Sequence, residues 1–186
     1  HSTIMDKYDP EKKIGLICDE WGTWFTCEPG TNPGFLYQQS TMRDALVAGL
    51  SLNIFNKHCD RVKMANIAQL INVLQAVILT DGPRMLRTPT YHVFHMYKYH
   101  QDADLVESYL DGVETIGEEK EYMVPSLQES VSVDKEGILT ITLNNLSVDK
   151  NEPVEITFAQ CQAKEVTAAI LNNEMHAYNT FEEPDK

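Results

Sequence analysis

The sequence predicts a mixed chain, with an α/β part over residues 1–102 and an all-β part over residues 103–186. One observation predicts the first part: a short apolar run is followed by an amphipathic segment, and this order is then repeated. Another predicts the second part, because from about residue 103 the apolar residues occur in short alternating runs, which are typical of strands with one buried face. The change of pattern places a domain boundary near residue 102.

The first predicted strand is the apolar run over residues 14–18. Four apolar residues in so short a run favour a strand covered on both faces, as parallel strands wrapped by helices are. Asp19 and Glu20 follow at once, and Trp21 and Trp24 come soon after. Two carboxylates beside two flat rings at a strand end make a candidate sugar site. The alternative is a solvated strand end with two core tryptophans.

A helix is predicted after the turn-rich segment 27–37. Thr41 is placed to cap it, and Asp44 three residues later gives a capping box in which the shorter acid replaces Glu. The following apolar residues recur at helical spacing over about four turns. Lys57 and His58 lie in the last turn, where the helix dipole favours cations. This segment therefore predicts an amphipathic helix.

The second predicted strand begins at Arg61, and its pattern becomes ambiguous before Leu79 because the apolar positions fit neither period. Thr88 followed by Pro89 predicts a second helix, which continues to about His100. Strand, helix, strand and helix in this order imply parallel strands with crossover helices. Two such units make only a quarter of an eight-unit TIM barrel, which needs about 250 residues. We therefore expect further units upstream, since two parallel strands alone expose their edges.

Short alternating runs in the second part predict an antiparallel β-sandwich. The plainest apolar face is that of Leu139, Ile141 and Leu143, which Thr140 and Thr142 oppose. The predicted strands cover residues 105–110, 127–133, 138–143, 154–158 and 166–171.

Composition excludes several classes of function. The net charge is −13, from 15 Lys and Arg against 28 Asp and Glu, which argues against nucleic acid and anionic membranes as partners. The four cysteines form no C-x-x-C pair, and His92 and His95 lack a third ligand, so neither a metal nor another cofactor is predicted. No signal sequence is predicted, and no membrane span is predicted because no apolar run comes near the roughly 20 residues that one needs. The cellular compartment stays open.

Four stretches carry a resemblance to a known family, and they run through nearly the whole chain: DEWGTWF (19–25), RDALVAGLSLNIFNKHCDRVKMANIAQLINVLQA (43–76), TPTYHVFHMYKYH (88–100) and HAYNTFEEP (176–184). The chain resembles the C-terminal part of an alpha-L-arabinofuranosidase of glycoside hydrolase family 51. This resemblance implies the last two strand-helix units of a TIM (β/α)8 barrel followed by an antiparallel jelly-roll β-sandwich, with the whole truncated at both ends. The argument from size agrees with it.

The resemblance also implies three site residues. Glu20 matches the nucleophile, Trp24 matches a tryptophan that lines the substrate pocket, and Gln69 matches a glutamine that contacts the sugar. Retaining hydrolysis needs two carboxyl groups roughly 5–5.5 Å apart. The resemblance places the acid/base Glu on an earlier barrel strand, in sequence that this chain does not contain. We interpret Asp19 as structural, because successive strand side chains point to opposite faces.

The expected function is that of a retaining glycoside hydrolase that releases terminal non-reducing alpha-L-arabinofuranosyl residues from arabinan or arabinoxylan. We expect this chain alone to be inactive, because the proton donor is absent. The expected partners are an arabinose-containing oligo- or polysaccharide and the remainder of the barrel, and a homo-oligomer stays open. The alternative function is a non-catalytic carbohydrate-binding or structural β-sandwich module, although the strands offer few aromatic residues beyond Tyr109, Tyr122 and Phe158.

Overall fold

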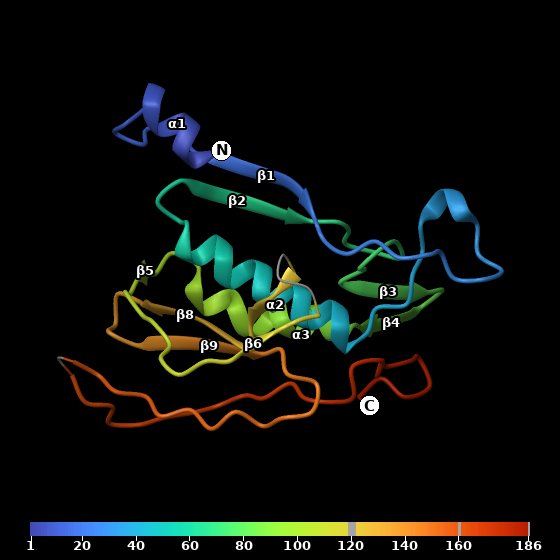
Figure 1. Ribbon diagram of the computed structural model, residues 1–186. Helices are drawn as coiled ribbons and strands as arrows, with labels where there is room; N and C mark the ends of the chain where they lie inside the picture. Colours follow the sequence, from blue (N-terminus) through green and yellow to red (C-terminus); the bar gives the residue numbers. More distant parts are fainter. Residues whose placement is uncertain (119–121, 160, 186) are drawn as a thin grey trace.

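The computed structural model describes residues 1–118, 122–159 and 161–185 (Figure 1). Their strands form four small sheets of two or three strands and no closed barrel. None of the helices in these ranges has the length and apolar character of a membrane span. In chain order the elements are α1 (Ser2–Tyr8), β1 (Leu16–Trp21), η1 (Pro33–Phe35), α2 (Met42–Lys57), β2 (Val62–Ile67), β3 (Ile78–Asp81), β4 (Arg84–Arg87), α3 (Pro89–Tyr97), η2 (Lys98–His100), β5 (Asp104–Leu105), β6 (Thr115–Ile116), β7 (Val124–Pro125), β8 (Leu127–Val133) and β9 (Leu139–Asn145).

Strands β1 and β2 are parallel neighbours, and α2 connects them (Figure 1). The predicted parallel strands with a crossover helix are therefore confirmed for β1, α2 and β2, whereas two further strands separate β2 from α3. The register of the pair shifts after Cys18. Cys18 pairs with Ala65 and Trp21 pairs with Ile67, so three residues of β1 lie opposite two residues of β2. Such an extra residue is a β-bulge, which bends a strand and changes the direction of its side chains. The bulge includes Asp19 and Glu20.

The ambiguous segment before Leu79 consists of β2 and of residues 68–77, which form no helix or strand, and a β-hairpin that the sequence analysis did not predict follows it. Strands β3 and β4 pair antiparallel around Gly82 and Pro83, with Leu79 opposite Leu86. Both leucines are buried, and they pack with Ala76 in a small apolar cluster. The Asp-Gly-Pro sequence thus marks a tight turn between two strands rather than the end of one.

One side of the β1–β2 pair is more open than predicted. Ile17 and its neighbour Met64 are 52% and 53% exposed. The helices cover the other side, where Trp21 packs on Phe55 of α2 and Phe94 of α3 at ring-centroid distances of 5.4 and 6.1 Å. The expectation of a strand covered on both faces is therefore wrong for the described chain, since apolar content does not show whether both covering layers are present.

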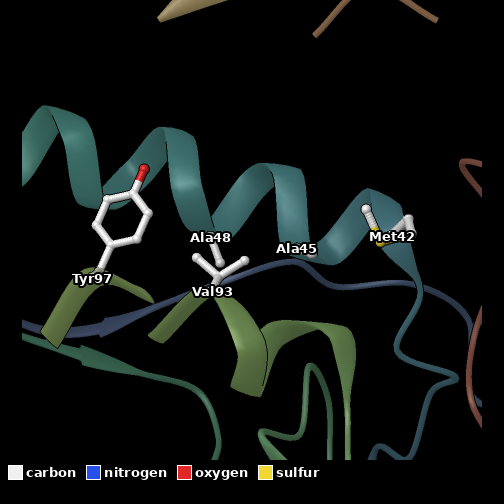
Figure 2. Close-up of a cluster of buried hydrophobic side chains, with 5 residues drawn as sticks. All are labelled: Met42, Ala45, Ala48, Val93 and Tyr97. Atoms are coloured by element: carbon white, nitrogen blue, oxygen red, sulfur yellow. The ribbon is translucent and has the colours of Figure 1, made fainter. Parts of the chain in front are cut away.

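Helix α2 begins with the predicted capping box, in which Thr41 and Asp44 exchange hydrogen bonds. Its buried stripe packs against α3 through five side chains that Figure 2 shows, with those of α2 facing Val93 and Tyr97. The two alanines of this stripe are small, which favours close packing of the two helices. The cluster consists of Met42, Ala45, Ala48, Val93 and Tyr97.

The same helix also lies very close to β9. A Cβ atom on Gly49, in the middle of α2, would lie 2.2 Å from Oδ1 of Asn144. A glycine inside a helix costs about 1 kcal/mol relative to alanine, and the close contact explains its use here. The Tyr97 hydroxyl lies 2.8 Å from Oδ1 of Asn53 and accepts a hydrogen bond from Nδ2 of Asn144 at 2.8 Å. Hydrogen bonds therefore join α2, α3 and β9.

The sheet of β5, β8 and β9 turns its hydroxyl groups toward the helices. Thr142 is 9% exposed and donates to Oδ1 of Asn53 at 2.8 Å, while its neighbour Leu143 is 41% exposed. Ser130 and Ser132 of β8 are also buried. The helices thus cover the face that carries Thr142 and not the predicted apolar face of Leu139, Ile141 and Leu143. The reason is that the helices present polar groups to the sheet. An alternating sequence shows that the two faces of a strand differ in polarity, but it does not show which element packs on each face.

Two of the predicted strands are absent. Residues 154–158 and 166–171 are described and form no strand. Most of their apolar side chains are open to solvent, with Val166 79% and Ile170 87% exposed, whereas Leu171 packs against the cluster of α2 and α3. The prediction was wrong because an alternating pattern supplies side chains for a face but no hydrogen-bonding partner for the backbone. In contrast, the strand predicted at 127–133 is confirmed as β8, which pairs antiparallel with β9.

Because of His100, we expect the folded protein to lose stability in mild acid. Its Nδ1 lies 2.7 Å from the Ser132 hydroxyl and its Nε2 3.1 Å from the Thr142 hydroxyl. Burial lowers the pKa of His100 below its ordinary value of 6.5. The neutral ring therefore stabilises the fold above about pH 6.5, and this contribution is lost as pH falls through the lowered pKa. We expect the melting temperature of the full-length protein to fall more steeply below pH 6.5 than that of His100→Gln. The exposed His176→Gln should keep the steep fall.

Candidate functional site

The carboxyl ends of β1 and β2 bring Glu20 and Gln69 to one edge. Trp21 pairs with Ile67, and the amide of Ala68 donates to the Trp21 carbonyl at 2.8 Å. Glu20 directly precedes this pair, while Gln69 follows it by two residues. Both side chains are exposed. Polar residues at the carboxyl ends of neighbouring parallel strands converge at the same edge of a sheet, which is where ligands bind in such folds.

The two tryptophans of this stretch have separate environments. Trp21 packs among the aromatic rings of α2 and α3, and its buried Nε1 has no hydrogen-bond partner among the described residues. Trp24 is 68% exposed. The alternative of two core tryptophans thus holds for Trp21 alone, and Trp24 is free to contact a ligand.

A buried hydrogen-bond network holds the backbone just before Trp24. The amide of Thr23 donates to Oε1 of Gln75 at 2.6 Å, and the Thr23 hydroxyl donates to Oδ1 of Asp44 at 2.5 Å. Gln75 in turn donates to the Asp44 carbonyl at 3.0 Å. Gln75 and Asp44 are both 0% exposed. Buried polar groups that are fully bonded fix one local geometry, so Thr23 is held in place.

Gly22 allows the chain to pass this network. Its φ of +152° lies in a region that side chains disfavour. A Cβ atom on Gly22 would lie 2.8 Å from Oε1 of Gln75 and 3.1 Å from the carbonyl oxygen of Ala68. Neither neighbour leaves room for a methyl group. The residue between Trp21 and Thr23 therefore has to be small and flexible in φ.

The backbone after Trp24 is also fixed. The amide of Phe25 donates to Oε1 of Gln38 at 2.8 Å, and Nε2 of Gln38 donates to the carbonyl of Thr23 at 3.3 Å. The guanidinium of Arg43 lies 3.6 Å from the centre of the Phe25 ring, in cation–π contact. Trp24 is thus an exposed side chain on a backbone that is anchored on both sides. Such preorganisation lowers the entropy that ligand binding costs.

The sequence analysis missed the residues that anchor this loop. Asp44 was predicted only as a helix cap, and its second oxygen bonds Thr23. Gln38 and Gln75 lie in segments without regular periodicity, and both are nearly or fully buried. A buried glutamine is uncommon, but nothing in the local sequence shows that it is buried. No signal could have found them without the tertiary structure.

The histidines of α3 have contacts that account for them. The ring of His95 stacks on Tyr91 at 6.1 Å, and its Nε2 lies 3.2 Å from Nζ of Lys98. Burial lowers the pKa of His92. In the described ranges no three His, Cys, Asp or Glu side chains gather as a metal site would require.

Comparison with known proteins decides the family. A sequence model described as the alpha-L-arabinofuranosidase C-terminal domain matches residues 19–186. The chain belongs to this family. It is also 48% identical over its full length to an intracellular exo-alpha-L-arabinofuranosidase from Bacteroides ovatus, of which it covers 36%. The resemblance drawn from the sequence motifs is therefore confirmed.

Solved structures agree with this arabinofuranosidase C-terminal assignment. The glycoside hydrolase family 51 arabinofuranosidase from Xanthomonas axonopodis pv. citri is 43% identical and superposes with a TM-score of 0.82 over 99% of this chain and 37% of its own. The alpha-L-arabinofuranosidase from Thermotoga maritima, at 22% identity and a TM-score of 0.75, shares the fold. The chain thus spans little more than a third of the length of these relatives.

Proposed function

We propose that this chain is the C-terminal part of a retaining alpha-L-arabinofuranosidase, with Glu20 as its nucleophile. The observation that carries the proposal is that the exposed residues Glu20 and Gln69 lie at the carboxyl ends of two parallel strands that pair with each other. Its relatives are named arabinofuranosidases, which supports the substrate class. The full enzyme releases terminal non-reducing alpha-L-arabinofuranosyl residues from arabinan or arabinoxylan.

The chemistry proceeds in two steps. The Glu20 carboxylate attacks the anomeric carbon, and the glycosidic bond breaks as the leaving oxygen takes a proton from a second carboxylic acid. Water, deprotonated by that same group, then cleaves the glycosyl ester and restores Glu20. The two carboxyl groups flank the sugar about 5–5.5 Å apart. Asp19 is not assigned as the second one, since successive side chains along a strand point to opposite faces and do not converge on one sugar. The remainder of the enzyme supplies the acid.

Trp24 and Gln69 bind the sugar in this proposal. An exposed indole offers a flat apolar face to the C–H groups of a sugar ring. The primary amide of Gln69 has two donor hydrogens and an acceptor oxygen, which suit neighbouring hydroxyl groups. The anchored backbone on both sides of Trp24 fixes the point from which its side chain extends.

The finer fold assignment is part of the same proposal. Residues 1–102 supply the last two strand-helix units of a (β/α)8 barrel, and residues 103–186 belong to a jelly-roll β-sandwich. The exposed side of β1 and β2 supports this assignment, because it carries the apolar residues Ile17 and Met64, whereas a side that faces solvent is usually polar. The remainder of the barrel is the partner that covers them.

Trapping of the covalent intermediate tests the proposed role of Glu20. The full-length protein is mixed with an aryl arabinofuranoside that has a good leaving group, denatured within a turnover and digested. Mass spectrometry should find one arabinosyl group on the peptide that contains Glu20, and NMR of the first-formed product should show retained anomeric configuration. A label on another carboxylate, or inversion at the anomeric carbon, contradicts the assignment.

The alternative of a non-catalytic sugar-binding module has less support. Tyr109 and Tyr122 are 87% and 69% exposed, but neither lies in a strand of the described sheets. They therefore form no flat aromatic face of the kind that binds polysaccharide chains. Saturable binding of arabino-oligosaccharides by a protein that lacks hydrolytic activity would favour this alternative.

A further inference from the structure

Residues 175–184 pack against the start of α2 and the β3–β4 hairpin, and we call this segment the clasp. In Figure 1 it is the dark red segment beside β4 and the first turn of α2. The amide of Met42 donates to the carbonyl of Ala177 at 3.0 Å. The amide of Arg43 donates to the carbonyl of Met175, also at 3.0 Å. The first N–H groups of a helix have no acceptor within the helix, so the clasp supplies acceptors for two of them.

The clasp is also attached to the β3–β4 hairpin. Asn179 is 6% exposed, and its Nδ2 donates to the carbonyl of Arg87 at the end of β4 and to the carbonyl of Pro184, the latter at 2.9 Å. Two residues later, Phe181 packs on the buried cluster of Ala76, Leu79 and Leu86. A buried amide that is bonded at two points fixes one local geometry, so the clasp is held firmly here.

Asn179 contributes more to this attachment than the neighbouring ion pair does. Arg84 of the hairpin pairs with Glu182 of the clasp at 3.0 Å, but both side chains are exposed. Exposed ion pairs contribute little to stability. Breaking the hydrogen bonds of a buried side chain costs more, because no water replaces the lost partner. Asn179 is therefore the residue whose loss should release the clasp.

The contacts of the clasp adjoin the two residues that hold Thr23. Asp44, which accepts from the Thr23 hydroxyl, directly follows Arg43 in α2. Gln75, which accepts from the Thr23 amide, directly precedes Ala76 of the cluster that the clasp covers. The clasp thus supports the backbone beside both hydrogen-bond acceptors of Thr23.

Thr23 links this support to the candidate site. It lies directly before Trp24 and three residues after Glu20. Its hydrogen bonds to Asp44 and Gln75 are 2.5 and 2.6 Å long. A displacement of about 1 Å would lengthen them to about 3.5 Å, where a hydrogen bond is largely lost. A displacement of the same size at a catalytic group costs about 10²-fold in rate.

We propose that the clasp positions the loop that follows Glu20 and carries Trp24, with Asn179 as the positioning residue. Asn179 takes no chemical step. It holds the clasp, the clasp holds the first turn of α2 and the segment before β3, and these two hold Thr23. The proposal rests on the proposed function, because a reaction rate reports on this loop only if Glu20 takes part in the reaction.

Kinetics of the full-length protein test the role of Asn179. At a temperature where every variant is folded, Asn179→Ala should lower kcat/KM for an aryl arabinofuranoside about tenfold to 10²-fold. Asn172→Ala changes an exposed asparagine before the clasp and should keep kcat/KM within about twofold of the wild-type value. A lower melting temperature of Asn179→Ala without the loss in kcat/KM would show a merely structural role and would overturn the proposal.

A double-mutant cycle tests the route through Thr23. Thr23→Val removes the hydroxyl that donates to Asp44. In that background Asn179→Ala should lower kcat/KM by no more than about threefold, because the two changes act on the same contact. Independent effects would multiply, so an undiminished loss contradicts the proposal. If Asn179→Ala does not fold, Phe181→Leu replaces it in both experiments with the same expected results, since it weakens the contact with the cluster before and within the hairpin.

A spectroscopic measurement separates this proposal from the proposed function. The full-length protein is labelled with fluorotryptophan, and the fluorine resonance of Trp24 is identified by its loss in Trp24→Phe. Asn179→Ala should shift or broaden this resonance, and Asn172→Ala should leave it unchanged. An unchanged resonance in Asn179→Ala would overturn the proposal. A wild-type protein that does not hydrolyse the aryl arabinofuranoside would instead overturn the proposed function, and the resonance would still report on the clasp.

Discussion

Replacing Glu20 by Gln should lower kcat of the full-length protein on an aryl arabinofuranoside by at least about 10³-fold. The amide has nearly the same shape but cannot attack the anomeric carbon. Because Glu20 is exposed at the end of β1, the change should leave the melting temperature within a few degrees of the wild-type value. A steady-state assay and a thermal melt on the same preparation measure both.

Two further variants make this expectation specific. Asp19→Asn changes the neighbouring carboxylate and should keep kcat within about threefold, since Asp19 takes no chemical step. Glu20→Ala leaves space for a small anion, so added azide should restore turnover and give an arabinosyl azide of the opposite anomeric configuration. Near-normal activity in Glu20→Gln would rule out its role as nucleophile, and a loss confined to Asp19→Asn would exchange the two assignments.

Replacing Gly22 by Ala should both destabilise the protein and lower its activity. The φ of +152° and the two close neighbours of the new methyl group give an expected loss of about 2–4 kcal/mol in unfolding free energy. The backbone must shift where it joins Glu20 to Trp24, and a displacement near 1 Å costs about 10²-fold in kcat/KM. Denaturant unfolding and steady-state kinetics of the full-length variant measure the two effects.

Gly30→Ala is the matched control for this substitution. Gly30 has a φ of +81°, yet a Cβ atom there meets no atom within 4 Å. Gly30→Ala therefore introduces backbone strain without a steric clash, and it should keep full activity. If Gly22→Ala and Gly30→Ala lose equal stability and both keep activity, the network of Gln75 and Asp44 does not control the position of the loop.

The elements with strong local signals could be predicted from the sequence. The Thr41 capping box and the Thr88–Pro89 helix start are formed by residues within one turn of each other, and both are present in the structure. The strand at 127–133 has a pattern that its neighbour along the chain can pair with directly. Each of these features depends on interactions close in sequence, so the sequence alone contains enough information to find them.

The features that were mispredicted depend on distant partners. Thr142 is buried because Asn53, 89 residues away, accepts its hydrogen bond. Gln75 is buried because Thr23 donates to it across 52 residues. Residues 154–158 alternate as a strand would, but no described strand pairs with them. A local pattern cannot specify which distant group completes it.

The candidate site divides in the same way. Resemblance to a family supplied Glu20, Trp24 and Gln69 as site residues, and the pairing of β1 with β2 places the first and the last at a common edge. Their roles stay predictions. The residues that anchor the loop could be recognised only from the tertiary structure.

Helix α2 links two regions that the chain separates. Its first turn carries Asp44, which holds the loop before Trp24, and its second half carries Asn53 and Lys57, which bond β9 and β8. Sixteen residues of helix span about 24 Å and bend little over that length. A shift of the all-β part would thus be transmitted along this rod to the loop instead of being absorbed. Through α2, the sheet of β5, β8 and β9 is thus joined to the loop that carries Trp24.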